Sequence, residues 1–212
     1  MRIETTNTSV QLVEFYSDLG QWAVRWDFQP KKNEHGQDTG VYWYEEHIYN
    51  WIPTIGDIQQ TITEWHNKQT DGMIEHGFEW KGIKVYLNDE NKFNYKAITD
   101  EAARIETAIA IWDKENPELA GQTFIVEEGA DGEGNIVRMS TPTGRPISKL
   151  PVTLKLGETN LSENFYTFTT ITELQEFFSA GVDHLIGAYG AGWYKIATFD
   201  WMPYVQALEE LK

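Results

Sequence analysis

The sequence has no cysteine, few basic residues and no long apolar run. Without cysteine the chain can form neither disulfide bonds nor thiolate metal sites, and the absence fits a reducing compartment. No segment approaches the ~18–20 consecutive apolar residues that a membrane-spanning helix needs, so we expect no membrane span. Residues 1–7 contain no apolar core of a secretory signal, so we expect none there.

The shortage of basic residues gives an acidic chain, with 17 Lys and Arg against 33 Asp and Glu and a net charge of −16. The excess is spread along the chain, because residues 1–50, 51–120 and 121–212 carry −4, −6 and −6. An even negative field favours solubility and repels nucleic acid and anionic membranes, so we expect no nucleic-acid partner. The alternative is a DNA mimic that inhibits a nucleic-acid-binding protein, which predicts one continuous carboxylate face.

Aromatic residues are abundant, with 9 Trp, 10 Tyr and 10 Phe, and this content argues against disorder. Over residues 21–28 and 41–51 they alternate at strand spacing, whereas residues 10–16 fit either a strand or a helical turn. Residues 30–40 form a polar connection with several turn formers. We therefore predict an aromatic-rich β segment over residues 1–51. Its last strand has apolar bulk on both faces, so it is either covered on both sides or contacts a partner.

Seven aromatic residues of this β segment are candidate interface residues. Trp and Tyr are enriched at protein interfaces, and their rings can also stack on sugars. Ordinary packing within the sheet is the simplest interpretation, and a protein interface and glycan binding are the alternatives. The seven residues are Trp22, Trp26, Tyr42, Trp43, Tyr44, Tyr49 and Trp51.

Two stretches in the middle of the chain have the apolar spacing of amphipathic helices. The first begins at Thr54, a good N-cap with Asp57 in the first turn, and fades by residues 67–72. The second begins at Thr99, after a polar stretch at residues 88–91 that is typical of a loop.

The clearest amphipathic pattern begins near Thr172, in a sequence that fits a capping box. Gly181 within it suggests close packing, because glycine weakens a helix interior by about 1 kcal/mol relative to alanine. A short helix from Asp200 closes the chain. We expect the long helix to end at a group of glycines, Gly187, Gly190 and Gly192.

Strand patterns lie between the predicted helices. A hairpin over residues 78–87 turns at Lys81-Gly82, since glycine accepts positive φ without cost. The sequence thus predicts an α+β fold: antiparallel β-hairpins packed with three to four helices, plus the N-terminal aromatic β segment. We expect one subdomain over residues 1–51 and an α+β domain over 52–212. The remaining strands are a hairpin insertion at about 121–148 and a pair at 151–156 and 164–170.

The sequence offers no catalytic or metal-binding constellation. Its five histidines lack zinc-ligand spacing, and there is no nucleophile elbow or phosphate-binding glycine motif. Asp131 begins a stretch like a calcium loop, but Ile136 and Pro142 stand where an EF-hand needs Gly and Glu, which leaves only an incidental cation at this hairpin tip. His76 beside Glu75 is more simply a solvated pair than a catalytic one. We expect no enzymatic activity, no cofactor and no metal.

Two groups of residues carry a resemblance to a known family. The first is Ile74, then Gly77-Phe78-x-Trp80-x-Gly82-x-x-Val85-x-Leu87, followed by Phe93-Asn94-Tyr95-x-Ala97. The second is Phe168-Thr169 before the helix at Thr172, followed by Gly192-Trp193-x-Lys195. Over residues 53–199 the chain resembles an uncharacterised domain family found in tail-region and other virion proteins of tailed bacteriophages. That family has no defined reaction and no catalytic residues to transfer.

The resemblance implies a protein that is made in the bacterial host cytoplasm and located in the virion. With the missing catalytic motifs, it predicts a non-enzymatic structural or adaptor component of the tail or tail-fibre region. Its expected partners are other virion proteins, in a homo- or hetero-oligomer. A glycan-binding module that recognises the host surface and an acidic DNA mimic remain the alternatives.

Overall fold

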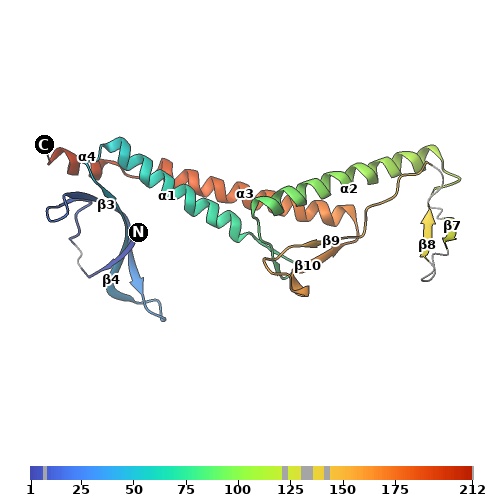
Figure 1. Cartoon of the computed structure of the whole chain (residues 1–212), viewed down its shortest axis with the longest axis horizontal. Coiled ribbons are helices and arrows are strands. Elements are labelled where there is room, and N and C mark those ends of the chain that lie inside the picture. Colours follow the sequence, from blue (N-terminus) through green and yellow to red (C-terminus); the bar gives the residue numbers. More distant parts are fainter. Residues whose placement is uncertain (7–8, 121–123, 130–135, 141–143, 212) are drawn as a thin grey trace. The chain divides into compact units, whose positions relative to one another are not determined.

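The computed structural model describes residues 1–6, 9–120, 124–129, 136–140 and 144–211, and Figure 1 shows their helices and strands. The fold class is α+β, as the sequence predicts, with helices and antiparallel strands.

The chain forms two compact units. Unit 1 comprises Met1–Asp71 and Tyr189–Lys212, and unit 2 comprises Gly72–Ala188. The sequence placed a boundary after residue 51, whereas unit 1 also takes in residues 52–71 and the C-terminal segment. The divisions fall inside two helices, α1 (Ile55–His76) and α3 (Ile171–Ala197).

Unit 1 contains a four-stranded antiparallel sheet in the order β1-β4-β3-β2. In the segment at residues 10–16, which fitted either a strand or a helical turn, residues 13–16 form a strand. The two longest strands extend through much of the predicted polar connection, leaving only residues 33–37 between them. That part of the prediction was wrong, because the exposed end of a strand pair needs no apolar alternation. The strands are β1 (Arg2–Thr5), β2 (Val13–Tyr16), β3 (Gln21–Lys32) and β4 (Asp38–Tyr49).

The core of unit 1 lies on one face of this sheet. Val24 and Trp26 of β3 pack with Ile58 and Ile62 of α1. Tyr204 of α4 (Met202–Glu209) joins the same cluster, and its hydroxyl donates a 2.8 Å hydrogen bond to the Arg25 carbonyl in β3. The two ends of the chain therefore share one core.

Helix α1 begins as the sequence predicts. The Asp57 N–H donates to the Thr54 hydroxyl at 3.2 Å, and the Asp57 carboxylate accepts from the Thr54 N–H at 2.8 Å. This reciprocal pair satisfies two backbone donors at the helix start. The helix continues to His76, beyond the predicted end at residues 67–72.

Unit 2 begins with the predicted hairpin, formed by β5 (Glu79–Trp80) and β6 (Ile83–Lys84). Both turn residues have positive φ, 47° at Lys81 and 82° at Gly82. This conformation matches the twist of the flanking strands, so the turn prediction is confirmed.

Helix α2 (Asp89–Glu115) begins ten residues before the predicted start at Thr99. The polar stretch at residues 88–91 is a helix start and not a loop, so that prediction was wrong. Asn88 is the N-cap, and its side chain accepts a 2.8 Å hydrogen bond from the Asn91 N–H. Short polar side chains favour loops and helix caps for the same reason, their capacity to bond nearby backbone.

The remaining strands of unit 2 form two antiparallel pairs, as predicted. One pair is β9 (Val152–Lys155) with β10 (Phe165–Phe168), and the short 3₁₀ helix η1 (Ser162–Asn164) lies in the connection between them. The other is β7 (Phe124–Gly129) with β8 (Ile136–Ser140), within the predicted insertion.

The core of unit 2 is made by residues from its helices, its strands and the segments beside them. Its buried residues are Val85, Leu87, Tyr95, Ala102, Leu154, Leu156, Phe168, Leu174 and Phe177.

Helix α3 differs from its predicted form at both ends. Its N-cap is Thr170 rather than Thr172, since the Thr170 hydroxyl accepts from the Glu173 N–H at 3.2 Å. The helix also runs through all three glycines that were expected to end it. A Cβ at Gly192 would lie 2.2 Å from the Thr70 hydroxyl of α1, so this glycine permits close helix packing within unit 1. In the part of the chain that the structure describes, no helix is long and apolar enough to cross a membrane.

Candidate interaction surface

Three of the seven predicted interface aromatics are buried in unit 1. Trp26 meets Trp65 of α1 edge-on, with ring centroids 6.2 Å apart. The Tyr49 hydroxyl donates to the Asp57 carbonyl at 3.1 Å and shares a 2.5 Å hydrogen bond with Thr61. Tyr44 packs against Phe28. These three rings belong to the packing of the sheet.

The other four aromatic residues lie nearer the surface and differ in how far they are exposed. Trp22, Tyr42 and Trp43 are partly buried. The Trp43 indole N–H donates to the Glu4 carboxylate at 2.8 Å, and the Lys31 ammonium lies over its ring. Trp51 follows β4 and has 58% of its surface exposed. Of the seven, Trp51 alone presents an exposed ring.

The most deeply buried ion pair in unit 1 joins Arg25 on β3 and Glu46 on β4, which stand directly opposite each other in the sheet. The Arg25 guanidinium is buried and donates to Glu46 at 2.7 Å, Glu14 at 2.6 Å and the Tyr16 hydroxyl at 2.5 Å. Burial opposes its charge, but the bonds to Glu46, Glu14 and Tyr16 outweigh burial and raise the pKa of Arg25. This cluster has the form of a structural ion-pair network, because Glu46 on β4 and Glu14 and Tyr16 on β2 all accept from the guanidinium.

Sequence reasoning missed an exposed aromatic face on α3, which consists of Tyr189, Trp193 and Tyr194. Trp193 and Tyr194 are 67% and 71% exposed, and the rings of Tyr189 and Trp193 stack with centroids 5.8 Å apart. Residues four apart meet on one side of a helix, so these two form a pair on the surface. The signal was the spacing of 189 and 193, which the glycines around them obscured.

The histidines and acidic residues offer little coordination chemistry. Across the described ranges, no three His, Asp or Glu side chains lie close enough together to hold a metal ion. His76 and Glu75 are both exposed, and the His76 ring contacts the Gly72 carbonyl at 3.0 Å. Burial lowers the pKa of His47 and of His66 in unit 1. The predicted hairpin tip at residues 131–135, the candidate for an incidental cation, lies outside the described residues.

Comparison with known proteins adds no relative. No protein-family model matches the chain, and neither the curated proteins nor the solved structures searched contain a significant match. The resemblance to the phage virion family therefore stays a prediction from the residues quoted above, as do glycan binding and DNA mimicry.

Proposed function

We propose that this chain is a non-enzymatic structural or adaptor component of a tailed-phage virion, which acts through protein–protein contacts in an oligomer. The observation that supports it is the exposed aromatic face of α3, Tyr189, Trp193 and Tyr194. The sequence resemblance supplies the virion setting.

Single exposed apolar side chains are ordinary, but neighbouring exposed Trp and Tyr rings are typical of interface hot spots. Their rotamer freedom is small, so ordering them in a complex costs little conformational entropy. Here they lie on a continuous helix, so their spacing is set before a partner binds. A preformed set of anchors loses less entropy on binding than a flexible loop does.

Replacing Trp193 and Tyr194 together by alanine tests the proposal. Each change removes an exposed ring from a helix surface, so folding stability should change by only about 0.5 kcal/mol. We expect incorporation into particles to fall by about tenfold or more, since truncating a hot spot costs about 2 kcal/mol or more. Mass spectrometry of purified virions, with light scattering of the isolated chain, measures incorporation and oligomeric state.

Leu19→Ala is the matched control, because Leu19 in unit 1 is 67% exposed and lies outside the α3 face. We expect this variant to behave like the wild type. A wild-type chain that is a stable monomer and is missing from purified particles would contradict the proposal.

A further inference from the structure

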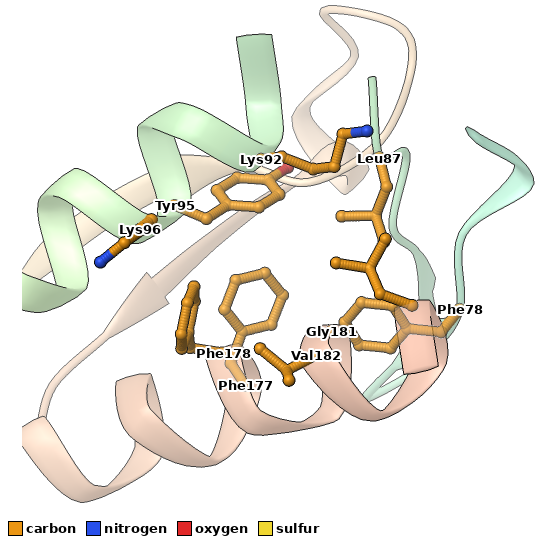
Figure 2. Close-up of a pocket in the computed structure, with 10 residues that line it drawn as sticks. Phe78, Leu87, Lys92, Tyr95, Lys96, Phe177, Phe178, Gly181 and Val182 are labelled. Atoms are coloured by element: carbon orange, nitrogen blue, oxygen red, sulfur yellow. The ribbon is translucent and has the colours of Figure 1, made fainter. Parts of the chain in front are cut away.

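Unit 2 has an apolar pocket between α2 and the part of α3 that belongs to this unit. Figure 2 shows Tyr95 of α2 facing Phe177, Phe178 and Val182 of α3, with Phe78 at one end. The floor is the buried core of unit 2, because Tyr95 and Phe177 belong to its central cluster. The pocket therefore opens directly onto the buried core of the unit.

The size of the pocket limits what can fill it. Its volume is about 190 Å³, whereas pockets for whole drug-sized ligands have volumes of about 300–1,000 Å³. An apolar cavity of about 150 Å³ is large enough to hold benzene. The space thus fits one aromatic ring or one branched aliphatic side chain.

Two lysines at the opening supply charge. Lys92 and Lys96 stand one turn apart on α2 and both line the pocket. Figure 2 shows their stems beside Tyr95, with the two ammonium groups directed away from the rings. Their present ion-pair partners, Asp89 and Asp100, are exposed. Exposed pairs of this kind contribute little to stability, so an incoming carboxylate can replace them.

Apolar surface continues beside the opening. Phe93 follows Lys92 on α2 and is 72% exposed, and Ile186 follows Leu185 on α3 and is 65% exposed. A molecule no larger than one ring would leave both side chains uncovered. A longer chain that inserts one side chain would cover them, as residues around a hot spot exclude water from it.

We infer that this pocket takes a single aromatic or leucine side chain of a partner protein, presented next to acidic residues. The inference rests on the proposed function only in that the chain binds proteins, and it adds a second contact on unit 2 with a stated chemistry. The apolar pocket gives affinity by burying the inserted side chain. The two lysines give selectivity by favouring acidic residues next to that side chain.

A peptide selection tests the inference without knowledge of the partner. Random dodecapeptides displayed on a carrier are selected on the full wild-type chain and depleted on Val182→Phe, whose larger side chain fills the pocket. We expect enriched peptides to share one Trp, Phe or Leu close to Asp or Glu. Their affinity should fall by about tenfold or more on Val182→Phe and on Lys92→Glu/Lys96→Glu, as expected for loss of an anchor.

Matched controls separate the pocket from general effects. Ser179→Phe enlarges an exposed residue on the same helix that does not line the pocket, and Lys114→Glu/Lys149→Glu makes the same charge change at exposed sites in unit 2. Both should keep affinity within about twofold, as expected for independent sites. If Val182→Phe has a melting temperature well below that of the wild type, Leu185→Phe is used in its place to fill the pocket.

Three outcomes of the selection overturn the inference: no enrichment over the filled variant, enriched peptides without an apolar anchor, or enriched peptides that are basic. Indole in an NMR titration serves as a side-chain probe and should bind more weakly than the selected peptides; indole that binds as tightly as they do would overturn the inference as well and make this a small-molecule pocket. Trp193→Ala/Tyr194→Ala should still bind the selected peptides. A chain that binds them but is missing from virions would reject the phage assignment alone.

Discussion

The two units bury different kinds of side chain. Unit 1 places Arg25 and Glu46 inside, on the face of the sheet opposite Val24 and Trp26, because neighbours along a strand point to opposite faces. In unit 2, Thr99 is the only buried polar side chain among the described residues, and the core is otherwise aromatic and aliphatic. Buried charges need particular partners, whereas an apolar core needs volume. We therefore expect unit 1 to lose stability when a buried charge is removed, and unit 2 to lose stability when the volume of a core side chain is removed.

The largest expected effect is the loss of Arg25. Arg25→Ala leaves the Glu46 carboxylate buried without its cation, and breaking a buried pair in this way costs about 3–5 kcal/mol. We expect the free energy of unfolding to fall by that amount, measured by urea denaturation followed by circular dichroism.

Replacing the pair as a whole sharpens this test. Arg25→Met with Glu46→Leu removes both charges and keeps apolar volume, so most of the lost stability should return. In unit 2, Phe177→Ala should cost a similar ~3–5 kcal/mol by leaving a cavity, which no charge change can offset. A double variant as unstable as Arg25→Ala would show that the cluster matters through packing and not through charge.

A middle-sized effect is expected from two glycines of α3 that lie in unit 1. Gly192→Ala places a Cβ 2.2 Å from the buried Thr70 hydroxyl and should cost about 1–3 kcal/mol by overpacking. Gly190 has open space around it, so Gly190→Ala should stabilise the helix by about 0.5–1 kcal/mol. Melting curves of the two variants should shift in opposite directions, and shifts of the same sign would contradict close packing at Gly192.

The smallest effect expected is a pH dependence in unit 1. Burial lowers the pKa of His66 below its usual 6.5, so the unfolded chain binds this proton more readily than the folded chain does. The stability that the neutral His66 ring contributes is fully present above about pH 6.5 and is lost as the pH falls below that value. We expect the melting midpoint to drop between about pH 7.5 and 5.5, where histidine changes charge.

His66→Gln should reduce that drop, because glutamine does not titrate. His35→Gln is the control, since His35 is exposed in the β3–β4 connection. Equal pH dependence in the wild type and in His66→Gln would assign the effect to other groups.

Local chemistry made several parts of the fold predictable from sequence. The cap at Thr54, the turn at Lys81-Gly82 and the last strand pair each depend on residues close together in the chain. The course of α3 through its glycines was not predictable in this way. Gly192 is explained by Thr70, which is distant in sequence, and a lone glycine gives no sign of which residue packs against it.

The candidate surface was harder to predict for a related reason. Trp26 and Trp193 are the same residue type, yet one is buried against α1 and the other is exposed on α3. Strand alternation placed Trp26 on a face but could not say which face would be covered. The buried charge of Arg25 was equally hard to predict, because Glu46, Glu14 and Tyr16 come from two other strands, β4 and β2, and only the pairing of these strands with β3 brings them together.

The discontinuity of unit 1 has a consequence for biosynthesis. The ribosome releases the strands of the sheet before unit 2, but Tyr204, which completes their core, emerges only after unit 2. During synthesis, at ~5–20 residues per second, the strands wait many seconds with Val24 and Trp26 incompletely covered. Unit 2 is a continuous segment and can fold during that interval. The order of folding would then reverse the order of synthesis, with the N-terminal sheet maturing after the unit encoded downstream of it.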